Sequence, residues 1–179
     1  MNDQPVPGRD MTIEEYEKII SYFDYINFCG NISDPVMNKW FTDFLKINYE
    51  RNIPCEVQHA ATGKKLSWYK KAFTTNPNAH WIFGLDGFPE ESHIYRINQK
   101  GDQLFEAMKL CVQMGLQTTW RMIIFKYNEE HVNECKQIAE DLGITFQYVI
   151  SSRFLKDDRY KPSKNFIVRD YENTIPKMS

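Results

Sequence analysis

Five short apolar segments, each followed by polar residues, recur along this chain of 179 residues at intervals of roughly 30 residues. That interval fits a β-strand, a helix and their loops, so the pattern predicts parallel strands that alternate with helices. The clearest segment covers residues 80–87, is apolar without alternation, and ends in Asp86 between Gly84 and Gly87. We interpret it as the central strand of a parallel sheet, covered by helices on both faces.

Polar residues also follow the other four predicted strands, which cover residues 25–30, 53–59, 119–125 and 145–150. The carboxyl ends of parallel strands meet at one edge of a sheet, where loops and helix amino termini form ligand sites. The sequence therefore predicts a small-molecule site at that edge. Its candidate residues are Gly30, Asn31, Ser33, Asp34, Thr62, Asp86, Lys126 and Asn128.

A helix precedes the first predicted strand. Thr12 and Glu15 have the spacing of a capping box, and an apolar stripe follows from Ile13. In an alternating fold, such a helix packs on a strand before it as well as on the strand after it. We therefore expect a missing upstream strand, so that either this segment or a second copy of the chain covers the exposed edge. Gly115 and Gly143 are placed to end two later helices.

The turn Cys29-Gly-Asn-Ile-Ser-Asp-Pro35 joins the first strand to a predicted helix. Backbone N–H groups and a helix amino terminus at one point can hold a carboxylate or phosphate. The alternative is an ordinary turn in which Asp34 caps the helix and Pro35 takes its first position. The two common nucleotide fingerprints, GxGxxG and GxxxxGK followed by Ser or Thr, are absent from the sequence.

Other candidate residues also have two interpretations. Asp86 suits a base, an acceptor for ribose hydroxyls or a local turn cap, and Asn128 suits either the site or the N-cap of its helix. His59 and His93 follow predicted strands, but neither has a partner at the spacing of a metal-binding pair, so we expect solvated side chains and no metal site. His80 lies at a strand entrance, away from the predicted site.

Composition excludes several classes of protein. Lys and Arg number 22 against 24 Asp and Glu, so the net charge of -2 provides no basic field for nucleic acid. No apolar run approaches the roughly 20 residues of a membrane-spanning helix. The four cysteines lie in apolar segments without metal-ligand spacing, which favours buried free thiols and a cytoplasmic location; they are Cys29, Cys55, Cys111 and Cys135.

The order of these motifs, over residues 10–154, resembles the radical S-adenosylmethionine (radical SAM) superfamily. The Cys29–Pro35 turn is similar to the family's Gly-Gly-Glu-Pro turn, and Gln58-His-Ala-Ala-Thr-Gly63 is similar to its threonine-asparagine-glycine turn. Phe83-Gly-Leu-Asp-Gly87 resembles the serine-isoleucine-aspartate-glycine strand end, and Phe125-Lys-Tyr-Asn-Glu129 resembles the end of the fifth strand.

This resemblance implies a TIM-like (βα)6 partial barrel that binds S-adenosylmethionine and a 4Fe-4S cluster. In the intact family, a CxxxCxxC loop after the first strand holds the cluster, which cleaves S-adenosylmethionine reductively. This sequence has no CxxxCxxC motif, so we expect no cluster on this chain and no activity from it alone. We predict an incomplete partial barrel of about five parallel strands with outer helices over residues 1–154, and a surface tail over residues 155–179.

Two functions from other classes remain open. The chain could be a cluster-free α/β module that binds a nucleotide-like ligand or a protein partner at the same edge. It could also be a metal-independent acid–base enzyme that uses Asp86 with His59 or Lys126. No GxSxG motif supports acyl transfer.

Overall fold

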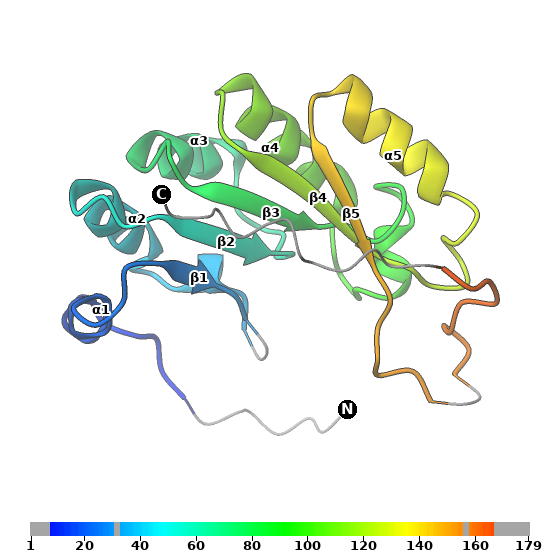
Figure 1. The fold of residues 1–179 in the computed structure, drawn as a ribbon, viewed down its shortest axis with the longest axis horizontal. Coiled ribbons are helices and arrows are strands. Elements are labelled where there is room, and N and C mark those ends of the chain that lie inside the picture. Colours follow the sequence, from blue (N-terminus) through cyan, green and yellow to red (C-terminus); the bar gives the residue numbers. More distant parts are fainter. Residues whose placement is uncertain (1–7, 31–32, 156–157, 167–179) are drawn as a thin grey trace.

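The predicted strands form one parallel sheet in a computed structural model that describes residues 8–30, 33–155 and 158–166. They are β1 (Ile26–Phe28), β2 (Cys55–His59), β3 (His80–Gly84), β4 (Thr118–Ile123) and β5 (Thr145–Val149). They lie side by side in chain order, and within the described residues β1 pairs with β2 alone and β5 with β4 alone (Figure 1). The sheet is not closed, which confirms the predicted partial barrel of about five parallel strands.

Helices alternate with these strands. They are α1 (Ile13–Ile20), α2 (Phe41–Glu50), α3 (Leu66–Thr75), α4 (Gly101–Gln113) and α5 (Val132–Asp141). Helices α2 to α5 cover one face of the sheet, and α1 lies beside β1 and α2 (Figure 1). We call the face that these helices cover the outer face, and the opposite face the inner face.

The outer face forms the hydrophobic core. Trp81 and Phe83 of β3 are fully buried, and Trp81 packs edge-on against Phe73 of α3 with ring centroids 4.9 Å apart. Trp120 of β4 makes a similar contact with Phe105 of α4 at 5.7 Å. Large aromatic side chains bury much apolar area and pack well edge to face, so these contacts hold the helices on the sheet.

The inner face is polar instead of apolar. Strand register places Glu56 beside His80 and Arg121 beside Gln147, and each of these side chains is only partly buried. The interpretation of the central strand as covered by helices on both faces is therefore wrong. Its inner side carries His80, Ile82 and Gly84, and among these His80 and Gly84 are only partly buried.

Sequence signals at helix ends are partly confirmed. The capping box of Thr12 and Glu15 is present at α1, with both reciprocal hydrogen bonds. Gly115 and Gly143 follow α4 and α5 with φ angles of 81° and 72°, the left-handed conformation that favours glycine at a helix end.

Two predicted helix starts are wrong. Asp34 caps only a short 3-10 helix, Pro35–Met37, and α2 begins later, at Phe41. The N-cap position of α5 is His131, whereas Asn128 lies in the preceding loop. The turn after β1 therefore lacks the long helix whose dipole would attract an anion.

The cysteines differ in exposure. Cys55, Cys111 and Cys135 are buried free thiols as expected, but Cys29 is exposed because it follows the edge strand β1. Burial raises the pKa of Cys55 to about 11. Within the described residues, no helix is long and apolar enough to cross a membrane.

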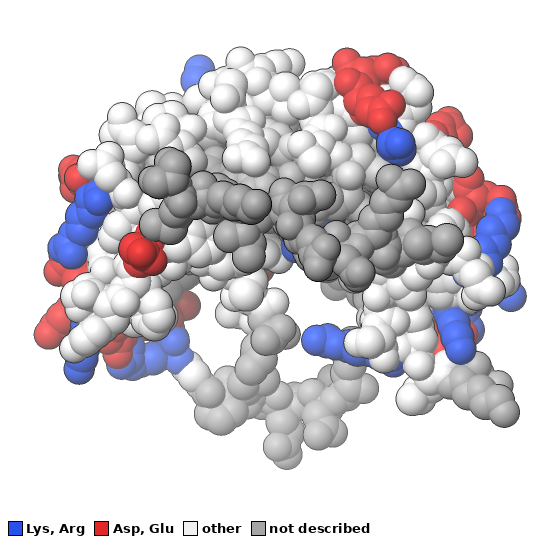
Figure 2. Space-filling view, in the orientation of Figure 1, with Lys and Arg blue, Asp and Glu red and all other residues white. Residues whose placement is uncertain are grey.

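Residues 158–166 pack near the end of β4. The backbone oxygen of Tyr160 accepts a hydrogen bond from the backbone N–H of Lys126 at 2.9 Å, and Phe166 contacts Tyr148 of β5 with ring centroids 6.3 Å apart. The division into a core over residues 1–154 and a surface tail stays a prediction. On the face drawn in Figure 2, acidic and basic residues are interspersed near both ends of the molecule.

Candidate ligand pocket at the carboxyl edge of the sheet

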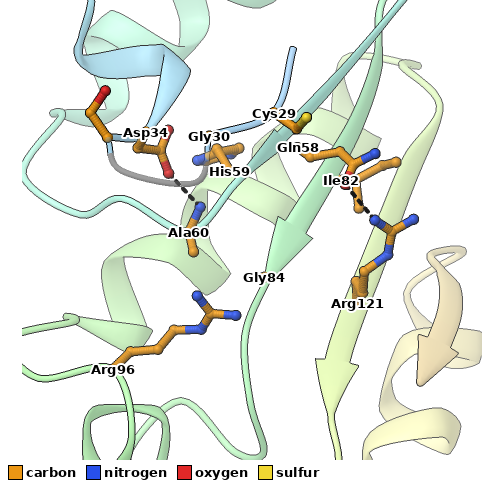
Figure 3. Close-up of a pocket in the computed structure, with 11 residues that line it drawn as sticks. Cys29, Gly30, Asp34, Gln58, His59, Ala60, Ile82, Gly84, Arg96 and Arg121 are labelled. Carbon is orange, nitrogen blue, oxygen red and sulfur yellow. Dashed lines mark hydrogen bonds between the residues drawn. The ribbon is translucent and has the colours of Figure 1, made fainter. Parts of the chain in front are cut away.

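A pocket of about 320 Å³ lies at the carboxyl ends of β1, β2 and β3 and beside Arg121 within β4. Because some of its lining residues belong to the inner face, it runs from the carboxyl edge of the sheet onto that face (Figure 3). This volume lies near the lower end of the usual range of about 300–1,000 Å³ for ligand sites. The lining residues are Cys29, Gly30, Ser33, Asp34, Gln58, His59, Ala60, Ile82, Gly84, Arg96 and Arg121.

Asp34 joins two of the loops that form the pocket. Its Oδ2 accepts hydrogen bonds from the backbone N–H groups of Ala60 at 2.7 Å and Ala61 at 2.8 Å (Figure 3). Its Oδ1 accepts from the N–H of Val36 at 3.1 Å. Both carboxylate oxygens therefore tie the turn after β1 to the end of β2, which makes Asp34 a positioning residue for the pocket.

Two of the residues that line the pocket are glycines with close neighbours. A Cβ atom on Gly30 would lie 1.7 Å from the backbone oxygen of Ser33, so the turn requires glycine there. A Cβ atom on Gly84 would lie 3.2 Å from the Cβ of Ala60 and 3.3 Å from Nη2 of Arg96. Gly84 thus leaves space directly beside a guanidinium group.

The buried carboxylate of Asp86 forms an ion pair with the partly exposed Arg96 beside the pocket. Nε of Arg96 donates to Oδ2 of Asp86 at 2.7 Å, and the backbone N–H of Ile123 donates to Oδ1 at 2.8 Å. Burial raises the pKa of Asp86, while Arg96 and Ile123 oppose that shift. The pair fixes Arg96 through Nε, and Figure 3 shows its guanidinium directed toward Ala60 and Gly84. Its Nη groups therefore line the pocket as donors for a carboxylate or phosphate.

The structure brings only some of the predicted site residues together. Gly30, Ser33 and Asp34 line the pocket, and Asn31 lies outside the described residues. Asp86 contributes through Arg96. The three other predicted residues, which do not line the pocket, are Thr62, Lys126 and Asn128.

Those three residues have other contacts. Thr62 bridges loops, because its hydroxyl accepts from the N–H of Lys100 at 3.2 Å. Asn128 is buried and closes its own loop, with Oδ1 accepting from the N–H of Phe125 at 2.8 Å and Nδ2 donating to the oxygen of Ile123 at 3.0 Å. Lys126 has an exposed side chain.

His59 is buried, whereas the sequence predicts a solvated side chain. Its ring lies 4.7 Å from Phe83, 5.5 Å from Trp81 and 5.6 Å from Tyr69, measured between centroids. Both ring nitrogens lack a hydrogen-bond partner among the described residues. Burial lowers the pKa of His59 to about 4, with Asp34 opposing the shift. The alternation along β2 decides this position, because His59 follows Cys55 and Val57 onto the outer face.

A hydrogen-bond network covers the inner face below the pocket. Nδ1 of His80 lies 3.2 Å from Oε1 of Glu56, and its Nε2 lies 2.8 Å from Oγ1 of Thr119. Asn27 donates to Oε2 of Glu56 at 3.2 Å and accepts at Oδ1 from Gln58 at 3.2 Å. These contacts join β1, β2, β3 and β4.

The same network reaches the pocket through Arg121. Nη1 of Arg121 donates to Oε1 of Gln58 at 2.6 Å, and its Nε and Nη2 donate to Oε1 of Gln147 at 3.4 and 3.1 Å. The network therefore spans all five strands and ends in two residues that line the pocket, Gln58 and Arg121.

Sequence reasoning missed both arginines of the pocket. Arg96 lies in the long loop between β3 and α4, where no periodicity indicates which residue turns toward the sheet. Arg121 lies within a strand, and its charge between Trp120 and Met122 is a signal that this strand has a polar inner side. Reading alternation instead of only strand ends would have identified it.

Structural comparisons show what the fold resembles. Streptococcus suis SuiB bound to S-adenosylmethionine superposes with a TM-score of 0.72 and 13% identity, over 92% of this chain and 39% of that chain. SuiB bound to precursor peptide SuiA gives a TM-score of 0.71 and 13% identity, over 92% of this chain and 38% of that one. Native anSMEcpe with bound AdoMet and Kp18Cys peptide gives 0.64 and 14%, over 84% and 47%.

These structures are radical SAM enzymes, so the chain has the fold that its motifs resemble. It spans less than half the length of each of those structures. No family model matches the sequence, and no curated protein matches it.

Proposed function

We propose that this chain is a radical SAM-type core fragment that binds S-adenosylmethionine in the pocket and holds no 4Fe-4S cluster of its own. The carrying observation is the position of Arg96, which directs two donor groups into a pocket at the carboxyl edge of this fold. A guanidinium fork matches the methionine carboxylate of the ligand. The S-adenosylmethionine bound to SuiB supports the choice of ligand.

The residues of the pocket fit the ligand better than they fit a cluster. A cluster of the family type needs three thiolates at one place. Among the described residues, no group of three or more His, Cys, Asp or Glu side chains could hold a metal ion, and Cys29 is the cysteine that lines the pocket. Cluster chemistry, where it occurs, therefore requires thiolates from a segment outside this sequence.

In this proposal each part of the chain has a defined task. Arg96 binds the carboxylate, and Asp86 orients Arg96 without touching the ligand. Gly84 leaves room beside the guanidinium, and Asp34 holds the turn after β1 against the end of β2. The alternative role of Asp86 as a catalytic acid or base fits the structure less well than this positioning role, because both of its carboxylate oxygens accept hydrogen bonds within the protein.

Titration calorimetry with S-adenosylmethionine tests the proposal. Arg96→Lys keeps the positive charge near Asp86 but loses the fork, so we expect affinity to fall by about tenfold or more. The exposed Arg153, which does not line the pocket, provides the matched control Arg153→Lys with unchanged affinity. Equal affinities for both variants and the wild type, or no binding to the wild type, would reject the proposed function.

A peptide partner is the second candidate. Two of the structurally similar enzymes have a bound peptide, SuiA in one case and Kp18Cys in the other. This candidate agrees with the predicted module that binds a protein partner at the same edge of the sheet.

A further inference from the structure

Residues 158–166, which we call the strap, lie against a loop at the carboxyl edge of the sheet. The middle of the strap is attached by the backbone N–H of Lys126, which donates to the backbone oxygen of Tyr160 at 2.9 Å. Its far end is attached by the carboxylate of Glu129, which accepts from the backbone N–H of Ser163 at 2.7 Å and from the hydroxyl of the same residue. Both attachments belong to the loop between β4 and α5 (Figure 1).

Tyr160 of the strap belongs to an aromatic cluster. The other members are Tyr95, Phe125 and Tyr127. Tyr160 packs edge-on against Tyr95 with ring centroids 5.5 Å apart, and the ring of Tyr95 lies 4.2 Å from that of Phe125. Phe125 is buried and stacks on Tyr127 at 5.5 Å. The cluster therefore joins the loop after β3, the loop after β4 and the strap.

The aromatic cluster is connected to both members of the ion pair at the pocket. The hydroxyl of Tyr127 donates to the backbone oxygen of Asp86 at 3.2 Å. Tyr95 directly precedes Arg96 in the chain, so the packing of its ring fixes the backbone from which the guanidinium extends. Among the described residues, the side chain of Arg96 makes one hydrogen bond, from Nε to Asp86. A single bond at Nε leaves the position of both Nη groups dependent on the loop backbone.

The residues around Arg96 have little apolar attachment of their own. Ile94 is 41% exposed and Ile97 is 76% exposed, so these aliphatic side chains do not hold the loop against the sheet. Segments that bury little apolar area open more readily than the core does. The packing of Tyr95 against Tyr160 therefore supplies an attachment that its neighbours lack.

We propose that Tyr160 is a positioning residue for the pocket, because the strap holds Tyr95 and thereby sets the guanidinium of Arg96 for the ligand carboxylate. The proposal rests on the proposed function and deepens it, since it assigns to the strap the control of ligand affinity at the same site. Tyr160 does not line the pocket, so its effect passes through Tyr95. When the strap is detached, part of the binding free energy is used to order the loop, and the affinity falls.

Titration calorimetry of the full chain with S-adenosylmethionine tests the positioning role. Tyr160→Ala removes the ring, and we expect the dissociation constant to rise about threefold to tenfold, the range that one aromatic pair contributes. Tyr160→Phe keeps the ring and should stay within about twofold of the wild type. Lys161→Ala is the matched control within the strap, because the exposed side chain of Lys161 makes no polar or ring contact with the described residues.

Glu129→Gln weakens the strap at its other attachment and leaves every ring of the aromatic cluster in place. The variant lacks the charged carboxylate that accepts from Ser163, so the affinity should fall in the same direction as in Tyr160→Ala. Circular dichroism before each titration establishes that the variants are folded. Unchanged affinity in Tyr160→Ala or in Glu129→Gln would overturn the positioning role. A loss in Tyr160→Phe or Lys161→Ala as large as that in Tyr160→Ala would overturn it as well.

Hydrogen exchange at Nε of Arg96 follows the positioning without any ligand. This N–H donates to Asp86, and its nuclear magnetic resonance signal is identified by its absence in Arg96→Lys. Exchange with water should be at least about threefold faster in Tyr160→Ala than in the wild type, and within about twofold of the wild type in Tyr160→Phe and Lys161→Ala. If the wild type does not bind S-adenosylmethionine, the proposed function fails, while exchange still tests the strap. If it binds but exchange in Tyr160→Ala equals that of the wild type, only the positioning role fails.

Discussion

The two faces of the sheet are built from the same strands but by different physical chemistry. On the outer face, aromatic residues such as Trp81 and Trp120 are fully buried against helices. On the inner face, Glu56, His80 and Arg121 are joined by hydrogen bonds and are partly exposed. Hydrophobic burial thus provides most of the stability on one face, while the other face can carry ligand contacts with little effect on folding.

The largest effect should come from the outer face. Trp81→Ala removes a fully buried indole that contacts Phe73 and Phe41, and we expect a loss of about 4 kcal/mol in the free energy of unfolding. Urea denaturation at neutral pH measures it. Leu66→Ala is the control, because Leu66 is 47% exposed and should change stability by less than about 0.5 kcal/mol. Similar values for the two variants would contradict the assignment of the core to this face.

The next effect depends on pH and involves His59. Its pKa is about 4 in the folded protein against an ordinary value of 6.5, so protons bind the unfolded chain more readily. The stability linked to the neutral ring is therefore complete above pH 6.5 and is lost as the pH falls toward 4. The loss should amount to about 3 kcal/mol.

Comparison with His59→Phe isolates this contribution, because other groups also titrate in that range. Urea unfolding of both proteins at pH 7 and at pH 4 should show a smaller acid loss for His59→Phe, by about 3 kcal/mol. The same acid loss in both proteins would mean that His59 is accessible to water and protons.

These contrasts also show how much the sequence could reveal. Periodicity, the capping box at Thr12 and the glycines at 115 and 143 define the elements locally, and parallel order follows from their spacing. Contacts between residues that are distant in the sequence cannot be predicted from such local patterns. The pair of Asp86 with Arg96 depends on how a loop folds back over the edge, and local patterns do not specify such a path.

The faces themselves were predictable only in part. Alternation along β2 distinguishes Cys55, Val57 and His59 from Glu56 and Gln58, and it assigns His59 to the core. The run in β3 hides this alternation, because Ile82 is apolar and buried although it lies on the inner face. A short apolar run does not by itself reveal whether helices cover one face or two.

The smallest effect should come from the inner face, with Glu56→Gln as the test. Burial lowers the pKa of His80, Glu56 raises it through its charge and hydrogen bond, and Arg121 lowers it. Removing the Glu56 charge should therefore move the pKa of His80 further down, as followed by titration of its ring protons by nuclear magnetic resonance.

The free energy of unfolding at neutral pH should fall by only about 1 kcal/mol in the same variant, because His80 then has a neutral amide in place of a carboxylate as its hydrogen-bond partner on a partly exposed face. A lower pKa of His80 in the folded state increases the stability that is lost when this ring is protonated. Below pH 6.5, Glu56→Gln should therefore lose more stability through His80 than the wild type does. A rise in the pKa of His80, or a destabilisation as large as that of Trp81→Ala, would show that the inner face contributes to folding as the outer face does.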